Sequence, residues 1–249
     1  MEKAVALTFD DGPDPIHTPR ILDILEENNI KATFFLIGSN IETYPELVKR
    51  IYDEGHIIGN HTFSHTPSYT LWSSKRIYED IWKTNDIIYK ITGKYPVFFR
   101  PPFGVTNPLI RRAVNNRFIS IGWNIRSYDT LKFLKRNSIS ERIIRNIKSG
   151  DIVLLHDNRE GSDILLESVI EGIKEKANYI FATYSLQFKH RTSGNMDDLY
   201  QNYLFQDHQF HSILNGNNSY ITMTSDCKKR INNINFSNSK PEHDNKHTQ

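Results

Sequence analysis

Residues 3–29 read KAVALTFDDGPDPIHTPRILDILEENN and contain one repeating unit of the fold. An apolar, β-rich run from Val5 to Phe9 ends in two acids and a Gly-Pro turn. In the helix-type segment that follows, Thr18 is a candidate N-cap, Pro19 occupies the first helical position and apolar residues recur at helical spacing. The stretch predicts a strand, a turn and an amphipathic helix.

The same order of strand and helix recurs about seven times along the chain. The predicted strands are Val5–Phe9, Ala32–Leu36, Ile57–Gly59, Val97–Phe99, Ile119–Ile125, Ile152–Leu155 and Tyr179–Ala182. Among the predicted helices, one begins after a second candidate N-cap, Thr43, and another covers Ser74–Thr92, with Gly93 as its terminator. Continuous apolar strands alternating with amphipathic helices predict a parallel sheet covered by helices, and seven units favour a barrel over a doubly wound sheet. In such folds the functional residues lie at the carboxyl ends of the strands.

Composition limits the classes of protein to which the chain can belong. Its 249 residues are 38% hydrophobic and 24% charged, which fits one globular domain with a full-sized core. The 31 Lys and Arg residues nearly balance the 29 Asp and Glu residues, so no global field is available to recruit nucleic acid or an anionic membrane. The single cysteine, Cys227, excludes an intramolecular disulfide framework and a Cys-rich zinc site.

The character of the chain changes near residue 190. We expect a catalytic domain over residues 1–189 and a polar tail over residues 190–249, which contains ten asparagines and allows one docked helix at Met196–Leu214 before a disordered end. We also expect a monomer without a transmembrane segment. No secretory leader precedes the first strand, so the sequence as given predicts a cytoplasmic protein, or an envelope or secreted one if a leader has been removed.

Two motifs near the N-terminus carry residues typical of metal sites. Asp10 and Asp11 end the first strand, and a bend at Gly12 could bring both side chains to one site, although an ordinary Asp-Gly turn is the alternative. His61 and His65 lie in HTFSH after the third strand. Two imidazoles four residues apart on a helical turn can bind one divalent ion, whereas a structural histidine pair is the alternative.

Three further motifs follow later strands. Arg100 lies in FFRPPFG, where it could pair with one of the acids in a loop stiffened by two prolines. Asp129 lies in WNIRSYDT. His156 ends the apolar run of IVLLHD, which places a group with a pKa near neutrality at the functional end of the barrel. Each motif has a structural alternative, but all five follow successive strands, where a barrel would gather them.

On these motifs the chain resembles the polysaccharide deacetylase family, also called the NodB-homology domain or carbohydrate esterase family 4. The resemblance covers roughly Lys3 to Gln187 and includes TFDDG, HTFSH, RPPFG, the Asp129 segment and LLHD in order. It implies a distorted (β/α) barrel of about seven strands. It also implies metal-dependent removal of N-acetyl, or less often O-acetyl, groups from an acetylated oligo- or polysaccharide such as chitooligosaccharide or peptidoglycan.

The resemblance also implies roles for individual residues. Asp11, His61 and His65 would bind one divalent ion, with Zn²⁺ as the first expectation and Co²⁺, Ni²⁺ or Mn²⁺ as alternatives. Asp10 would be the general base, held by Arg100, and His156 the general acid, tuned by Asp129. The backbone N–H of Phe103 would stabilise the oxyanion, and Phe in place of the family's usual Tyr preserves this backbone donor.

The fourth motif departs from the family pattern. Well-studied members have Asp and Trp where this chain has Arg126 and Thr130, which puts the substrate groove in question; Trp123 or Tyr128 could substitute. Two other functions stay open. One is a non-catalytic carbohydrate-binding protein on the same scaffold, and the other is a non-haem iron oxygenase with two His and one Asp as its facial triad.

Overall fold

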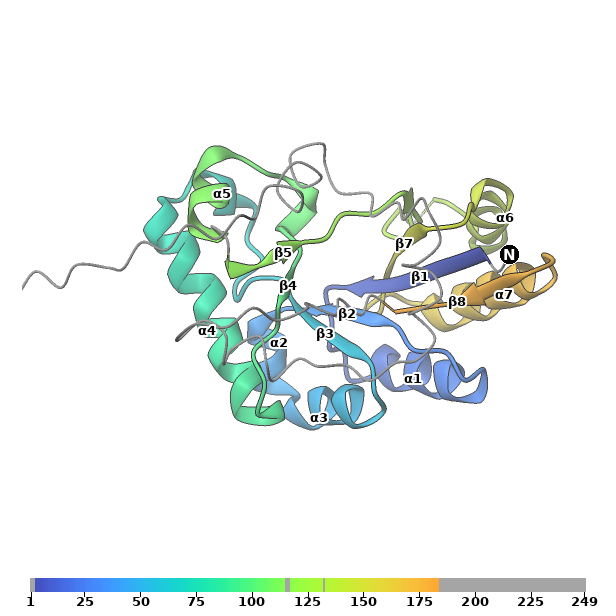
Figure 1. The fold of residues 1–249 in the computed structure, drawn as a ribbon, viewed down its shortest axis with the longest axis horizontal. Coiled ribbons are helices and arrows are strands. Elements are labelled where there is room, and N and C mark those ends of the chain that lie inside the picture. Colours follow the sequence, from blue (N-terminus) through green and yellow to red (C-terminus); the bar gives the residue numbers. More distant parts are fainter. Residues whose placement is uncertain (1–2, 115–116, 132, 184–249) are drawn as a thin grey trace, which may run out of the picture.

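The protein is described by a computed structural model that covers residues 3–114, 117–131 and 133–183 (Figure 1). The strands are β1 (Lys3–Asp10), β2 (Thr33–Leu36), β3 (Ile57–Asn60), β4 (Phe98–Phe99), β5 (Ile119–Ser120), β6 (Ile125–Arg126), β7 (Asp151–His156) and β8 (Tyr179–Phe181). The α-helices are α1 (His17–Glu27), α2 (Gly38–Thr43), α3 (Pro45–Asp53), α4 (Ser74–Thr92), α5 (Pro108–Val114), α6 (Arg136–Asn146) and α7 (Ser162–Lys174), and two 3₁₀ turns cover Pro67–Leu71 and Pro102–Gly104. The predicted tail, including Met196–Leu214, lies outside the described residues.

The strands form one parallel sheet in the order β5-β4-β3-β2-β1-β7-β6, with β8 paired to β1. β1 is the central strand. On one side, Val5 of β1 pairs with Asp151 of β7. On the other side, Val5 pairs with Phe181 of β8, and from Thr8 onward β1 pairs with β2. Helices surround the curled sheet (Figure 1). The predicted distorted (β/α) barrel is therefore confirmed.

The predicted single strand Ile119–Ile125 is wrong, because this segment forms two separate strands, β5 and β6. The N–H groups of Ile119 and Ile121 donate to β4 or the residue before it, whereas the N–H of Asn124 donates to Ile152 of β7. The segment changes partner at Gly122 because it crosses from one edge of the sheet to the other. The edge strands β5 and β6 are joined by chain and share no ladder, so the barrel is open there.

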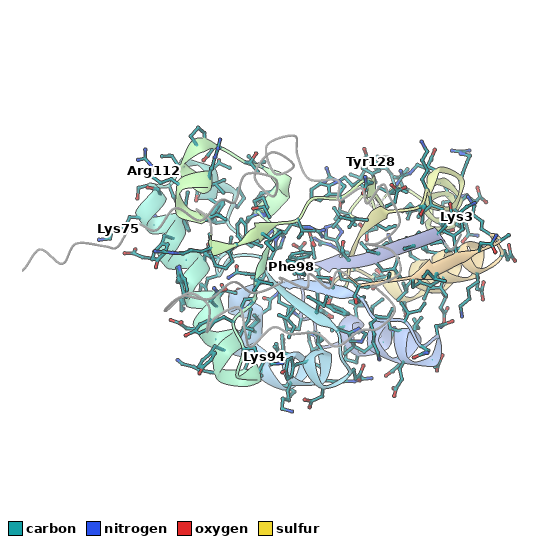
Figure 2. All side chains as sticks on the ribbon, in the orientation of Figure 1. Lys3, Lys75, Lys94, Phe98, Arg112 and Tyr128 are labelled. Atoms are coloured by element: carbon teal, nitrogen blue, oxygen red, sulfur yellow. The ribbon has the colours of Figure 1, made fainter. Side chains whose placement is uncertain are left out.

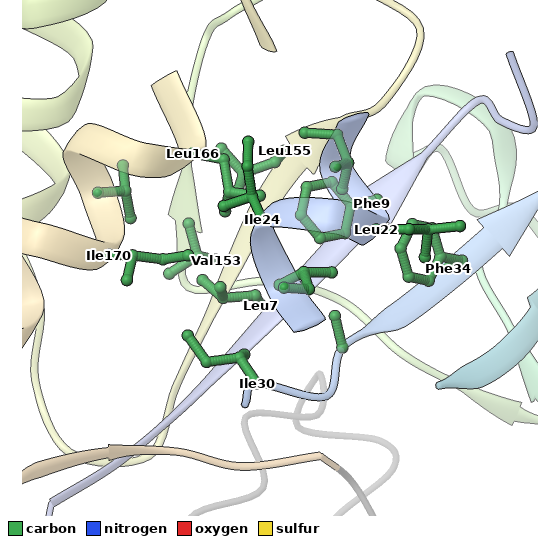
Figure 3. Packing of buried hydrophobic residues seen from close by; sticks show 14 of the residues in the cluster. Leu7, Phe9, Leu22, Ile24, Ile30, Phe34, Val153, Leu155, Leu166 and Ile170 are labelled. Atoms are coloured by element: carbon green, nitrogen blue, oxygen red, sulfur yellow. The ribbon is translucent and has the colours of Figure 1, made fainter. Parts of the chain in front are cut away.

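The two faces of β1 have different neighbours. Val5, Leu7 and Phe9 pack with apolar side chains of α1 and α7, and Figure 3 shows Leu7 and Phe9 among these residues. The other face carries Thr8 and Asp10 toward the inside of the barrel, where a second apolar cluster contains Phe35, Ile57, Phe98, Ile121 and Ile152. In Figure 2, Phe98 lies at the centre and charged side chains such as Lys75 and Arg112 lie at the periphery.

Two predicted helix caps are wrong. Thr18 lies inside α1 and its hydroxyl faces Asp157; Asp14 instead accepts hydrogen bonds from the N–H groups of Ile16 and His17. Thr43, a candidate cap for α3, is the last residue of α2, a short helix that the sequence pattern did not reveal. The predicted helix Ser74–Thr92 matches α4, which Gly93 ends with a φ of 72°. None of the helices in the described part combines the length and hydropathy of a bilayer-crossing segment.

Candidate active site

Asp10 and Asp11 both face the histidine motif. Asp10 is the last residue of β1 and Asp11 has a φ of 77°, which is uncommon for a residue other than glycine. The bend therefore lies at Asp11, whereas the sequence predicted it at Gly12. Gly12 is needed for a close approach instead, since a Cβ at this position would lie 2.2 Å from an oxygen of Asp157. The bend turns two neighbouring carboxylates to the same side.

The histidine motif is a loop, which corrects the predicted helical turn. Thr62 and His65 have φ values of 69° and 43°. Asn60 at the end of β3 supports the loop, because its Oδ1 accepts a hydrogen bond from the Thr62 N–H while its Nδ2 donates to Ile81 and Asn85 of α4. The two imidazoles converge with ring centroids 4.8 Å apart.

Asp11, His61 and His65 form a group that fits a divalent metal ion. One ligand atom from each residue lies within 4.8 Å of the others. Oδ1 of Asp11 is 3.5 Å from Nε2 of His61 and 3.3 Å from Nε2 of His65. The backbone carbonyl of Arg100 lies 2.7 Å from Nδ1 of His61, so Nδ1 carries the proton and Nε2 presents its lone pair to this group. Two imidazoles and one carboxylate are a donor set typical of catalytic zinc sites.

Charge in the site favours this ligand set. Burial raises the pKa of Asp11, but hydrogen bonding to His61 and the charges of His61, His156 and His65 outweigh burial and hold its pKa below the ordinary value. Burial, and then the neighbouring His61, lower the pKa of His65. Both shifts favour the states that a metal ligand needs, an ionised carboxylate and a neutral imidazole.

Arg100 is fully buried and its guanidinium is held by polar groups on several sides. Nη1 donates to Oδ1 of Asp10 at 2.6 Å and to the hydroxyl of Thr8 at 2.9 Å. Nε and Nη2 donate to the carbonyls of Ile121 and Gly122, and the guanidinium carbon lies 4.0 Å from the ring centroid of Phe35. The arginine therefore fixes Asp10 and also ties the end of β4 to the segment that follows β5.

His156 and Asp129 form a second buried pair. Nδ1 of His156 is 2.7 Å from Oδ1 of Asp129, and the other carboxylate oxygen accepts the backbone N–H of His156 at 2.9 Å. Burial lowers the pKa of His156, but the hydrogen bond and charge of Asp129 outweigh it and raise the pKa above the ordinary value. Burial raises the pKa of Asp129, and its bonds to His156 bring the net shift below the ordinary value. The pair therefore favours a charged imidazole beside a carboxylate.

Phe103 lies next to the group formed by Asp11, His61 and His65, which we call the metal-ligand group. Its φ of 58° is left-handed, the residue is 51% exposed, and its ring centroid lies 4.7 Å from that of His65. Within the described residues its N–H has no hydrogen-bond acceptor. The RPPFG loop thus brings Phe103 into contact with His65 of the candidate metal site.

The structure adds residues to which sequence reasoning gave no role. Nη2 of Arg159 is 3.2 Å from Oδ2 of Asp11, and the fully buried Asp157 accepts a hydrogen bond from Thr18 at 2.7 Å. Burial raises the pKa of Asp157 to about 7. Asp80 of α4 accepts the N–H of Phe63 and so supports the histidine loop. Of these residues, only Asp157 could have been suspected from the sequence, because it directly follows His156. Arg159 and Asp80 lie in a loop and a helix that the motifs do not include.

Known proteins are similar to this chain in sequence. The family model described as polysaccharide deacetylase matches residues 1–118. A peptidoglycan-N-acetylglucosamine deacetylase of Bacillus cereus is 39% identical over 177 residues, which are 69% of this chain and 64% of the relative. A second protein of that name from B. cereus is 38% identical over 202 residues, 76% of this chain and 91% of the relative. The peptidoglycan-N-acetylmuramic acid deacetylase PdaA of Bacillus subtilis is 34% identical over 72% of this chain and 69% of its own length.

Solved structures agree with these sequence relatives. The peptidoglycan deacetylase PdaC of B. subtilis has a TM-score of 0.68 and 32% identity over 81% of this chain and 93% of that chain. A family 4 acetyl xylan esterase of Clostridium thermocellum in complex with a cobalt ion has a TM-score of 0.67 and 34% identity over 72% of this chain and 87% of that chain.

The chain spans less than two thirds of some of its relatives, 64% of the first B. cereus protein and 38% of PgdA of Listeria monocytogenes. The second B. cereus relative, by contrast, is covered almost throughout at 38% identity. The residues 1–118 that the family model matches contain three of the five sequence motifs, TFDDG, HTFSH and RPPFG. The chain belongs to the polysaccharide deacetylase family.

Proposed function

We propose that this protein is a metal-dependent carbohydrate deacetylase that hydrolyses N-acetyl groups, or less often O-acetyl groups, of a glycan such as peptidoglycan or chitooligosaccharide. One observation carries the proposal: a metal-ligand group, a buried Asp–Arg pair and a buried His–Asp pair meet at one end of the barrel. The relatives named as peptidoglycan deacetylases support the reaction and the class of substrate.

Asp11, His61 and His65 would hold one divalent ion, with Zn²⁺ as our first choice. The related acetyl xylan esterase is in complex with a cobalt ion, which supports a bound metal ion in this chain. Such an ion, when bound, lowers the pKa of water and polarises a carbonyl group. Three protein ligands leave coordination positions open for these molecules.

Asp10 would take a proton from the attacking water. Its Oδ1 is bound to Arg100, which leaves Oδ2 facing the site at 3.7 Å from Nε2 of His61. The buried guanidinium fixes the orientation of the carboxylate, and a general base must be held within reach of the proton that it takes. The division of labour in the first motif is thus Asp10 for the proton and Asp11 for the metal.

The Phe103 N–H would donate to the acetyl oxygen as negative charge develops on it. A positioned donor of this kind contributes about 3–4 kcal/mol in the transition state. His156 would then give its proton to the departing nitrogen, so that water and the amide yield acetate and a free amine. Asp129 supports this role, because it holds the ring through Nδ1 and raises the pKa of His156.

The two other functions receive less support from the same contacts. A protein that only binds carbohydrate has no need for a general base and a general acid that each have a dedicated buried partner. An iron oxygenase with a two-histidine, one-carboxylate triad likewise needs neither Asp10 nor His156. Uptake of dioxygen that depends on iron and a 2-oxoacid would revive the oxygenase hypothesis.

The test is acetate release from acetylated glycans by the full chain after chelation and addition of a single metal. The panel comprises chitooligosaccharide, peptidoglycan and acetylated xylan. We expect metal-dependent release from at least one glycan, its near-complete loss in Asp10→Asn, and unchanged release in the matched control Asp53→Asn, a surface acid that pairs with Lys49. The proposal fails if the metal-loaded protein releases no acetate from any glycan and Asp10→Asn behaves like the unaltered chain.

A further inference from the structure

A cavity of about 470 Å³ lies at the open edge of the barrel, beside β6. Its size is within the range of about 300–1,000 Å³ that is typical of ligand pockets. The residues that carry polar or aromatic groups into it are Trp123, Asn124, Arg126, Tyr128, Arg142 and Asn146. The pocket therefore combines two aromatic rings, two guanidinium groups and two amides and contains no acidic residue.

The pocket adjoins the proposed catalytic residues through two direct connections. A Cβ at Gly104 would lie 2.3 Å from the Trp123 ring, so this ring packs closely against the loop that carries Phe103 and reaches His65. On its other side, Tyr128 directly precedes Asp129, the partner of His156. A glycan bound at the metal-ligand group would have this pocket beside it.

Tyr128 presents its ring to solvent in a conformation that few residues adopt. Its φ is 61° and the residue is 42% exposed. The guanidinium carbons of Arg126 and Arg142 lie 5.4 and 4.9 Å from its ring centroid. In Figure 2, Tyr128 lies at the rim of the molecule near α6. Strained residues of this kind are concentrated at functional sites, and an exposed aromatic ring between two cations suits a ligand that is both a sugar and an anion.

The two arginines differ in what they can offer. Arg142 donates from Nη2 to the backbone carbonyls of Arg126 and Ser127, so it holds the free edge of β6. Arg126 is exposed, and within the described residues neither arginine forms an ion pair with an acid. Because the chain as a whole is nearly neutral, this uncompensated positive charge is a local feature. Guanidinium groups bind carboxylates with two parallel hydrogen bonds.

We propose that this pocket is a subsite for the carboxylate of an acidic glycan, with Arg126 as its principal anion-binding residue and Tyr128 as the platform for the sugar ring. The inference rests on the proposed function and narrows its substrate class to glycan strands that carry carboxylates. The carboxylate can come from N-acetylmuramic acid, the acidic sugar in the names of some relatives, or from a peptide attached to it. Neutral chitooligosaccharides lack this group.

The test compares three ligands with the metal-loaded full chain. One is a neutral tetrasaccharide of N-acetylglucosamine, the second alternates N-acetylglucosamine with N-acetylmuramic acid, and the third is the second with peptides attached. The variants are Arg126→Gln and Arg126→Glu. The matched control is Arg145→Gln, an exposed arginine of α6 that does not line the pocket. Acetate release gives KM and kcat, and titration calorimetry with each variant combined with Asp10→Asn gives affinity without turnover.

We expect Arg126→Gln to raise KM and Kd for a carboxylate-bearing glycan by about tenfold or more, because a hydrogen bond to a charged group is lost. The values for the neutral glycan and kcat should stay within about twofold, and Arg126→Glu should have a larger effect. A response from the second ligand assigns the carboxylate to the sugar, and a response from the third alone assigns it to the peptide. Arg145→Gln should change nothing.

Two results would overturn the proposal: an equal change for neutral and acidic glycans, or no change for either acidic glycan. The calorimetric arm separates this failure from that of the proposed function. Binding selective for carboxylates without any acetate release would leave the subsite standing and reject the deacetylase. Acetate release combined with binding that does not depend on the carboxylate would support the deacetylase and reject the subsite.

Discussion

Arg100 and Arg126 stand at the ends of β4 and β6, on opposite sides of the gap in the barrel, and their surroundings are opposite. Arg100 is fully buried and bound to Asp10, Thr8 and two backbone carbonyls, whereas Arg126 is exposed and stands over an exposed ring. We call these regions the closed half (β1 to β4 and β7) and the open edge (β5, β6 and the segment between them).

The difference indicates a division of tasks. The closed half holds the proposed catalytic groups, which need fixed positions, and there each side chain has a buried partner. In the open edge, Ile119 and Ser120 are half-buried and Arg126 is exposed, so this edge tolerates replacement. The chain's departures from the family pattern, Arg126 and Thr130, lie at or next to this edge.

The largest effect is expected within the first motif of the closed half. Asp10→Asn should lower kcat/KM by about 10²–10⁴-fold, the usual contribution of a general base, while metal binding persists. Asp11→Asn should remove metal binding as well, because it removes one of three ligands. Metal content by atomic absorption, measured beside acetate release, checks this. Equal metal loss in both variants would contradict the split between the neighbouring acids.

The two arginines should differ in stability. Arg100→Met leaves the buried carboxylate of Asp10 without its partner and should destabilise the fold by about 3–5 kcal/mol. Arg126→Met changes an exposed side chain and should stay within about 0.5 kcal/mol. Urea unfolding followed by circular dichroism measures both. Similar losses in the two variants would remove the distinction between the regions.

The pH dependence of turnover tests the His156–Asp129 pair. The pKa of His156 is raised in the folded protein, so the stabilisation from its charged form is complete at low pH and is lost as pH rises through the raised pKa. Asp129→Asn removes the cause of the increase, and the alkaline limb of kcat/KM should move to lower pH. The rate above neutrality should fall by about ten- to a hundredfold. If the alkaline limb of kcat/KM keeps its position in Asp129→Asn, His156 is not the group whose titration produces that limb.

The smallest expected effect is a difference in stability between alanine substitutions at two glycines, Gly12 and Gly122. Gly12→Ala places a Cβ against Asp157 and should destabilise the fold by about 1–3 kcal/mol through overpacking. A Cβ at Gly122 in the open edge meets no atom within 4 Å. Gly122→Ala should therefore be neutral or stabilise the protein by up to about 1 kcal/mol, since alanine restricts the unfolded chain. Thermal unfolding of the two variants in parallel gives the comparison.

Much of the fold could be predicted because its signals are local. The period of apolar residues gave the strands and helices, and the matching bounds of α4 show how well a capped amphipathic segment can be read. The prediction of a single strand over Ile119–Ile125 was wrong because the two ends of this apolar run pair with different strands, β4 and β7. Thr18 failed as a cap because its hydroxyl binds Asp157, which lies 139 residues away.

The candidate site likewise has features that the sequence predicts and features that depend on tertiary contacts. The sequence by itself determined which residue types end successive strands, and a parallel barrel brings those ends together whatever the detail of the loops. Only the tertiary structure decided how they meet: the left-handed backbone at Asp11 and His65, the choice of Asp10 as partner of Arg100, and the support from Asn60. These features depend on contacts between distant segments, whereas strand and helix periods are set within a few residues.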